Sequence, residues 1–236
     1  EQRWTSLFLV RSSSKKMKTP SDRGTRSVKT VSILFVTQHY PPETAATGQL
    51  LAELAEDLVQ QGLQVTILAG RPSYGLTTGS TKTPSRETRN GVLVIRAPST
   101  RFNRTSHLGR IANWLSFPVA GLLRGVSGMP RPDVVVGYSA PPTALPIAYI
   151  LAKRWRAQFI VYLQDVYPHV AHAVNMMRKG ILFKIWRICN RWLYRRASSI
   201  ITLGEYMASR LQKEGVSAAR ISTVHNWADG QILHPM

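Results

Sequence analysis

The sequence predicts an α/β fold, a Rossmann-like and doubly wound sheet whose strands are mostly parallel. From residue 31 onward, short runs rich in β-branched residues alternate with longer segments of helical periodicity. This alternation is typical of right-handed βαβ units. Most of the runs are apolar at consecutive positions, as expected of strands that helices cover on both faces. These two observations define the predicted fold class.

Strands and helices follow one another in order along the chain. The predicted strands are 31–37, 64–70, 91–98, 133–139, 158–164, 199–204 and 220–226. The predicted helices are 47–61, 107–126, 142–156, 178–197 and 204–215. The first helix has the clearest pattern, because its apolar residues form one stripe and Gly62 supplies a C-terminal stop. We expect one domain over residues 31–225.

Two connections are longer than usual for this kind of fold. Residues 71–90 are rich in Thr, Ser and Gly and are expected to form a surface loop that covers a site. Residues 164–177 follow the fifth strand and bring together Asp165, His169 and His172.

Residues 1–30 are basic and rich in Ser and Thr, which predicts a disordered basic tail. The chain begins at Glu1 and stops at Met236, and we expect both ends to be cut or misassigned.

The composition points to an anionic partner. The chain of 236 residues is 44% hydrophobic, enough for a substantial core, and has a formal net charge of +19. Nucleic acid, a phosphorylated substrate and an acidic membrane surface all fit this charge. A single cysteine, Cys189, excludes an internal disulfide and suits a reducing, cytoplasmic compartment. We expect Cys189 to be a small buried apolar residue.

The loops after the first, fourth and fifth strands are the candidate site, because ligands bind outside the carboxyl ends of strands in such sheets. The first loop, "QHYPPETAAT", matches neither the dinucleotide nor the P-loop fingerprint. Thr47 is expected to cap the next helix, and Gly48 to allow close approach of an anion to its N-terminus. The alternative is a simple capped turn. In this cleft we also expect Tyr40, Ser139 and His169 to contact substrate or phosphate.

Asp165 is the candidate catalytic residue. It ends an otherwise apolar strand, where a carboxylate is costly unless it is paired or faces a cleft. There it would orient or deprotonate a sugar hydroxyl. The alternative is a capping role for the next segment. His169 and His172 lack a third ligand, so no metal site is expected.

The segment 178–197 has the pattern of a helix that lies on a membrane surface. Ile181, Ile185, Ile188, Cys189 and Trp192 share one face. The opposite side carries a basic stripe expected to contact an anionic membrane surface, made of Lys184, Arg187, Arg191 and Arg195. The alternative is a core helix with a solvated basic face.

The segment 107–126 is similarly apolar and includes Trp114 and Phe117. No segment is apolar enough to predict a spanning helix, so any membrane contact is expected to be peripheral, at the inner face of the plasma membrane. Nucleic acid is disfavoured, because no recognition motif is visible.

Several ordered segments resemble one known family. They are "ILFVTQHYPPETAATGQLLAEL", "GVLVIRAP", "RPDVVVGYSAPPTALP", "FIVYLQDVYPH" and "ISTVHNWAD". Together they resemble the N-terminal domain of family-4 retaining glycosyltransferases, and most of all the branch that builds bacterial surface polysaccharides on polyprenyl-linked acceptors. The resemblance covers about residues 31 to 236.

The resemblance implies one half of a two-domain GT-B enzyme. The first domain would hold a polyprenyl-linked or saccharide acceptor, and a second would bind the nucleotide sugar. No cofactor is implied beyond that donor substrate. Residues 226–236 are similar to the crossing between the domains, and the family's Glu-x7-Glu donor motif is absent. We therefore expect this chain to be inactive alone.

Two features depart from the family pattern. Ala46-Thr47-Gly48 stands where many relatives have a Gly-Gly pair, and Gln164-Asp165 where many have a His. The surface-polysaccharide branch is similar to this chain in having Asp there. The alternative function is a non-enzymatic basic module that binds anionic lipid or carbohydrate.

Overall fold

The computed structural model describes residues 30–72, 83–98, 100 and 107–227. The predicted basic tail, apart from residue 30, lies outside these residues, and so does the crossing segment beyond residue 227.

An 8-stranded sheet forms the centre of the protein, in the order β3-β4-β2-β1-β5-β6-β7-β8. Its strands are β1 (Ser32–Val36), β2 (Gln64–Gly70), β3 (Arg86–Arg89), β4 (Val92–Ala97), β5 (Val134–Tyr138), β6 (Gln158–Leu163), β7 (Ser199–Thr202) and β8 (Ile221–Thr223). All neighbours pair in parallel except β3 and β4, which are antiparallel. The prediction of a doubly wound, mostly parallel α/β fold is confirmed.

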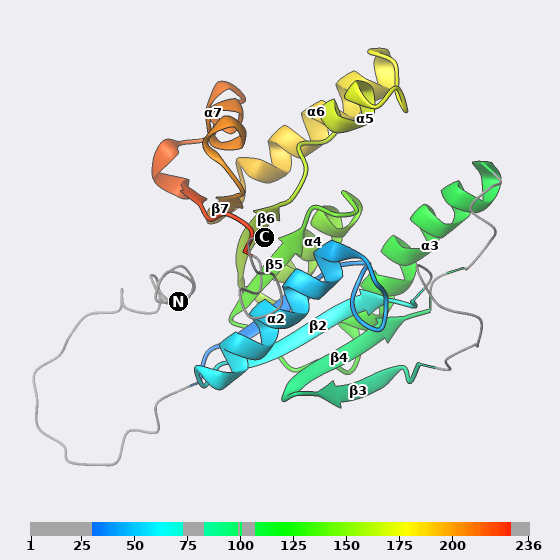
Figure 1. Ribbon diagram of the computed structural model, residues 1–236, viewed down its shortest axis with the longest axis vertical. Coiled ribbons are helices and arrows are strands. Elements are labelled where there is room, and N and C mark those ends of the chain that lie inside the picture. Colours follow the sequence, from blue (N-terminus) through cyan, green and yellow to red (C-terminus); the bar gives the residue numbers. More distant parts are fainter. Residues whose placement is uncertain (1–29, 73–82, 99, 101–106, 228–236) are drawn as a thin grey trace, which may run out of the picture.

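The helices divide unequally between the two faces of this sheet. They are α2 (Ala46–Gln60), α3 (His107–Val126), α4 (Ala144–Trp155), α5 (His169–Ala173), α6 (Ile181–Tyr194) and α7 (Glu205–Lys213). Helix α2 packs on one face, whereas α3, α4, α6 and α7 contribute to the core on the other (Figure 1). A short 3-10 turn, η1 (Ala218–Arg220), precedes β8.

The central strands are buried on both faces because their side chains alternate between two cores. In β1, Leu34 and Val36 face the core under α3 and α4, while Ile33 and Phe35 face the core under α2. All of these side chains are at most 1% exposed. Full burial of one such side chain contributes about 1.5–3 kcal/mol, so the consecutive apolar runs are what hold the sheet between its helices.

Strand β3 corrects the expectation that residues 71–90 form only a loop. It joins β4 through Asn90 and Gly91, both at positive φ (48° and 80°), the geometry that a two-residue hairpin turn requires. The pattern of hydrophobic residues does not predict this strand, because its sequence is Arg-Glu-Thr-Arg and it lies at the edge of the sheet. Helix α5 likewise occupies part of the predicted 164–177 loop.

Candidate active site at the carboxyl edge of the sheet

The chain changes its winding direction at the boundary between β1 and β5. From β1 it proceeds to β2 on one side, and from β5 it continues through β6 to β8 on the other. The loops that leave β1, β5 and β6 therefore meet at one edge of the sheet, where open α/β sheets bind ligands. The pairing of Val36 with Gly137 and of Tyr138 with Tyr162 sets these three strand ends level.

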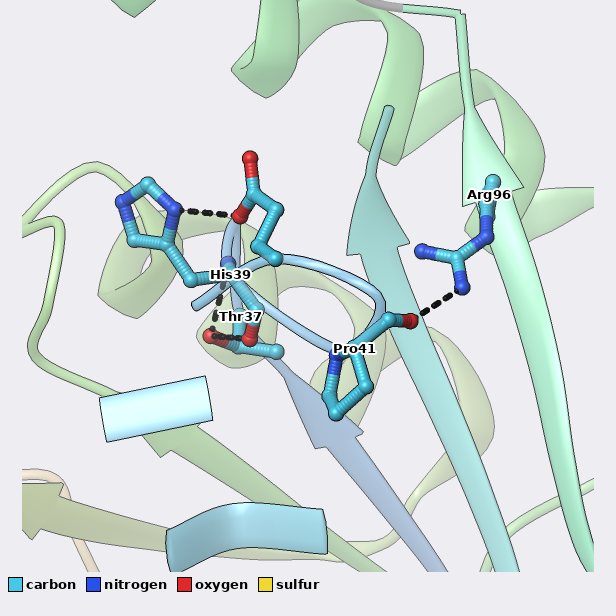
Figure 2. A network of polar contacts seen from close by, with 5 residues as sticks. Thr37, His39, Pro41 and Arg96 are labelled. Carbon is cyan, nitrogen blue, oxygen red and sulfur yellow. Dashed lines mark hydrogen bonds and ion pairs between the residues drawn. The ribbon is translucent and has the colours of Figure 1, made fainter. Parts of the chain in front are cut away.

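An ordered histidine–glutamate pair lies in the first of these loops. The Nδ1 atom of His39 is 2.8 Å from Oε2 of Glu43, whose side chain is only 1% exposed, against 21% for His39 (Figure 2). Thr37 fixes the backbone of His39, because its Oγ1 accepts the His39 N–H at 3.3 Å and donates to the His39 carbonyl at 3.2 Å. A carboxylate at Nδ1 favours the tautomer with its proton there, which leaves Nε2 as a hydrogen-bond acceptor.

Arg96 holds the same loop from the side of β4. Its Nη2 donates to the Pro41 carbonyl at 2.6 Å (Figure 2). The same nitrogen donates to Oε1 of Glu87 at 2.7 Å. Arg96 is 2% exposed, so this pair of contacts joins the loop to the β3–β4 hairpin inside the protein. Charged donors make strong hydrogen bonds when buried, and the loop after β1 is therefore rigidly placed.

The structure corrects the roles predicted for Thr47 and Tyr40. Helix α2 begins at Ala46, its N-cap is Ala45, and no side chain caps it, so Thr47 lies within the first turn. Tyr40 is 0% exposed and belongs to the core under α2. Burial raises the pKa of its hydroxyl to about 12. Its ring supports the loop instead of reaching a substrate.

Gly48 does permit close approach, but to the protein's own backbone. A Cβ at this position would lie 3.2 Å from the carbonyl carbon of His39 and 3.3 Å from the Tyr40 nitrogen. The missing side chain lets α2 sit against the loop that carries the His39–Glu43 pair. Gly48 is therefore a packing residue of the site.

Ser139 also acts through the backbone. Its buried hydroxyl accepts the N–H of Gln164 at 2.8 Å and that of Asp165 at 3.2 Å. These bonds join the end of β5 to the end of β6. They position Asp165 and occupy the hydroxyl that we expected to contact substrate.

Asp165 is half-buried at this edge, and burial raises the pKa of its carboxyl. Among the described residues its carboxylate has neither a hydrogen bond nor an ion pair. Burial, with the Asp165 charge as a smaller cause, raises the pKa of the neighbouring Tyr167 hydroxyl, whose ring stacks on Trp186 with centroids 5.4 Å apart. A half-buried carboxylate without a partner among the described residues suits a hydroxyl-rich ligand.

His169 lies between helices instead of facing a ligand. Its Nδ1 is 2.8 Å from Nη2 of Arg210 on α7, and its Nε2 is 4.0 Å from Oε1 of Glu214. Burial and the Arg210 charge lower the pKa of the His169 ring. The Nδ1 of His172 instead lies 3.0 Å from the Met177 carbonyl. Within the described part of the chain, no three His, Cys, Asp or Glu residues gather as metal ligands would.

Comparison with known proteins identifies the family. A family model described as "Glycosyl transferase 4-like domain" matches residues 46–227. The chain belongs to this glycosyltransferase family. It is 24% identical over 210 residues to the putative colanic acid biosynthesis glycosyl transferase WcaI of Escherichia coli K12, with 84% of this chain and 50% of that protein covered. It thus spans about half the length of the curated relative that it matches.

Solved structures agree with the assignment at the level of the fold. The domain resembles HepE of Anabaena, solved with UDP and glucose, at a TM-score of 0.52 and 15% identity. That match covers 86% of this chain and 46% of HepE. Sucrose-phosphate synthase of Thermosynechococcus elongatus gives a TM-score of 0.63 at 10% identity, with 87% and 50% covered.

The glycosyltransferase domain contains site residues that sequence reasoning missed. The His39–Glu43 pair lies before residue 46, outside the matched family range. A signal was present, since His39 and Glu43 bracket the two prolines of the opening loop. No sequence signal marked Arg96, because a single arginine in an apolar strand does not indicate whether its side chain is buried or what it binds.

Helix α6 of this domain exposes its apolar face. Ile181, Ile185, Ile188 and Trp192, here called the α6 stripe, are 77%, 52%, 66% and 43% exposed. The helix is anchored by a different face, with Phe183, Asn190, Leu193 and Tyr194 buried. The expectation of a buried Cys189 is wrong, because it is exposed beside the stripe.

The predicted basic stripe lies beside this apolar face, and the expectation that it lies opposite is wrong, because the opposite side of the helix is the buried one. The stripe turns toward α7. Nε of Arg187 is 3.3 Å from Oε1 of Glu214, and Arg191 lies beside Gly215. Lys184 and Arg195 are exposed. In the similar helix α3, Phe117 is buried, whereas Val119 and Leu123 are exposed. The side chain of Trp114 lies outside the described residues. In the described part of the chain, no helix is both long and apolar enough to cross a membrane.

Proposed function

We propose that the complete protein transfers a sugar from a nucleotide-sugar donor to a polyprenyl-linked or saccharide acceptor, with retention of configuration at the transferred carbon. The main support for this proposal is the half-buried Asp165 carboxylate, which has no partner among the described residues and lies at the same edge of the sheet as the His39–Glu43 pair. Family membership and the assignment of the relative WcaI to colanic acid biosynthesis support a polysaccharide product.

In this proposal, the domain supplies the acceptor side of the reaction. Asp165 accepts a hydrogen bond from a sugar hydroxyl and thereby orients that hydroxyl. Nε2 of His39 accepts a hydrogen bond from the acceptor substrate. Glu43 holds the imidazole in the required tautomer, and Arg96 holds the loop. Stabilisation of the leaving diphosphate falls to a second domain. No metal or cofactor is part of the proposal, and we expect no transfer by the 236-residue chain alone.

The test compares the chain with the protein extended through a second Rossmann-like domain. Both are incubated with a panel of nucleotide sugars and a polyprenyl diphosphate-linked acceptor. We expect transfer by the extended protein only, and loss of about 100-fold or more in kcat/KM for Asp165→Asn and for His39→Asn. Asp57→Asn, in the last turn of α2 and remote from this edge, serves as the matched control. Transfer by the short chain, or full activity of Asp165→Asn, would contradict the proposal.

We also propose that the domain contacts an anionic membrane surface through the α6 stripe. A surface helix with exposed isoleucines and a tryptophan, flanked by cations, fits the boundary between headgroups and acyl chains. This location is the inner face of the plasma membrane if the protein is cytoplasmic. It would bring the site to a lipid-linked acceptor.

Vesicle flotation tests the membrane contact directly. Ile185→Glu with Ile188→Glu should abolish flotation with vesicles that contain phosphatidylglycerol. Glu substitutions at the exposed polar positions Gln49 and Gln60 of α2, on the other face of the sheet, should not. Unchanged flotation of the α6 variant would exclude the stripe. Flotation without any transfer by the extended protein would favour the alternative, a non-enzymatic lipid-binding module.

A further inference from the structure

A basic pocket lies at the edge of the sheet opposite the candidate active site. It is a cavity of about 320 Å³ between the ends of α4 and α6, with Phe159 at the start of β6 and Ser198 before β7 in its lining. Strand starts and strand ends lie at opposite edges of a parallel sheet. The pocket is therefore separate from the edge that carries Asp165.

The lining of this pocket is cationic and has no acidic side chain. It includes Lys153, Arg156 and Arg196, all exposed, and none of them makes an ion pair among the described residues. A neighbouring hollow of about 360 Å³ shares Arg156 and adds Arg131 and Arg154. Such a concentration of unpaired positive charge attracts an anion and favours phosphate, which arginine binds through paired N–H groups.

Aromatic rings hold two of these cations without neutralising them. The guanidinium carbon of Arg196 is 3.7 Å from the centroid of the Trp192 ring, and Nζ of Lys153 is 5.8 Å from that of Tyr149. Contacts of this kind orient a cation while its charge stays available. The pocket is thus partly organised before any ligand binds.

The pocket continues directly into the α6 stripe. The rings of Tyr149 and Trp192 touch edge to face, with centroids 5.0 Å apart, and Trp192 is the last residue of the stripe. A cationic hollow at the end of an exposed apolar strip matches a ligand with an anionic head and an apolar body. Charge complementarity and this continuity together select a lipid over a soluble phosphate.

We propose that the pocket binds the phosphate of an anionic phospholipid headgroup, with the acyl chains beside the α6 stripe. This site rests on the proposed membrane contact and adds to it a specific headgroup. Because the pocket lies at the far edge of the sheet, a membrane lipid would occupy it while the candidate active site binds the acceptor substrate.

The test measures binding of the chain to three kinds of vesicle. They are phosphatidylcholine alone, phosphatidylcholine with phosphatidylglycerol, and phosphatidylcholine with oleate at the same surface charge, which carries a carboxylate in place of phosphate. The pocket variant is Arg156→Gln with Arg196→Gln. The control, Arg86→Gln with Arg89→Gln, removes equal charge from exposed positions of β3 at the other end of the sheet.

We expect the wild-type chain to prefer phosphatidylglycerol vesicles over oleate vesicles. The pocket variant should lose about tenfold or more in affinity for phosphatidylglycerol vesicles, against less than about threefold for the control. Equal losses in both variants, or equal binding to the two anionic vesicles, would overturn headgroup recognition. Circular dichroism and thermal melting check that both variants fold, and Arg196→Lys, which keeps the charge, should recover part of the binding.

Two further measurements distinguish a lipid phosphate from a soluble phosphate, and failure of the headgroup site from failure of the α6 contact. Millimolar glycerol 3-phosphate should leave vesicle binding unchanged, and displacement of the chain by it would show a soluble-phosphate site instead. If wild type binds but Ile185→Glu with Ile188→Glu binds equally, the α6 contact fails. If that variant loses binding while the pocket variant behaves like its control, the headgroup site alone fails. Absence of wild-type binding to any vesicle would overturn both.

Discussion

Two carboxylates at the same edge of the sheet have different roles because their burial and their partners differ. Glu43 is 1% exposed and lies within hydrogen-bond distance of Nδ1 of His39, at 2.8 Å, so it serves to orient the ring. Asp165 is half-buried with no partner in the described chain, and its carboxyl has a raised pKa. An ionised group left without a partner costs stability, which is consistent with a residue kept for its function.

The His39–Glu43 pair should behave as a coupled unit in folding. We expect His39→Asn and Glu43→Gln each to destabilise the chain, and the double variant to lose less than the sum of the two. The coupling free energy should be about 0.5–3 kcal/mol, as for residues in direct contact. Urea denaturation of the four proteins measures it. A coupling of zero would show that the pair is not formed in solution, and a parallel cycle of Glu43 with distant Arg124 gives the baseline.

Asp165→Asn should stabilise the protein at neutral pH while it impairs function. The pKa of the folded-state carboxyl lies above its unfolded value of about 3.9. Its contribution to stability is therefore fully present below that value and is lost as pH rises through the folded pKa. Thermal melts should show the variant about 1–3 °C more stable at pH 7 and equal to wild type near pH 3.5.

A contrasting variant tests the cause of that difference. Glu205→Gln removes an exposed carboxylate from the first turn of α7, where negative charge is favourable. It should be neutral or slightly destabilising at pH 7. The same stabilisation in both variants would point to net charge instead of burial at Asp165.

At the scale of elements, the β3–β4 hairpin supports the candidate site. Its turn places Glu87 on β3 beside Arg96 on β4, and Arg96 in turn holds the Pro41 carbonyl. A hairpin at the edge of the sheet thereby fixes the loop that leaves the central strand β1. The turn also packs on α2, since Gly91 lies against Val59.

Two glycines with similar positive φ allow the packing of the turn to be tested. Gly91 and Gly62 have φ of 80° and 85°, but a Cβ on Gly91 would lie 2.6 Å from Cγ1 of Val59, whereas one on Gly62 meets nothing within 4 Å. Gly62→Ala should cost about 1 kcal/mol from backbone strain alone. Gly91→Ala should cost about 1–3 kcal/mol more by chemical denaturation, because it also overpacks. Adding Val59→Ala should recover part of that extra loss, and equal costs at the two glycines would contradict the packing.

The elements that the sequence predicted are those that follow a hydrophobic period. The consecutive apolar runs of β1, β2 and β5 placed the parallel sheet, and through it the edge at which Asp165 lies. Strand β3 was missed because its residues are polar. The start of α2 was misplaced because Thr is a favoured capping residue, whereas this helix begins after Ala45 without a side-chain cap. The hydrogen bonds of Ser139 with Gln164, of His169 with Arg210 and of Arg96 with Pro41 could not be predicted, because they join residues far apart in the chain and depend on side-chain packing.

The whole molecule has two unlike sides. One face of the sheet carries α2, while α3, α4, α6 and α7 form a broader layer on the other (Figure 1). The exposed apolar residues Val119 and Leu123 of α3, Ile150 of α4 and the α6 stripe all belong to helices of this layer. A chain of net charge +19 with such a surface has both components of interfacial binding.

These two components should separate with salt. Raising the salt concentration from about 0.05 to 0.5 M shortens the screening length to a few ångströms and should weaken binding to phosphatidylglycerol vesicles at least tenfold. The residual binding should depend on the α6 stripe and disappear in Ile185→Glu with Ile188→Glu. Co-sedimentation across a salt series measures both effects. Salt-independent binding would contradict a contribution from charge.

The polar composition of β3 has a consequence for how copies of the protein avoid one another. An edge strand with unpaired backbone groups is a template on which another chain can add a strand. Here the edge next to β4 is only four residues long, and its exposed side chains include Arg86 and Arg89. A second β3 that approached edge to edge would set like charges against each other. The short length and the charges of β3 therefore also disfavour edge-to-edge aggregation of the sheet.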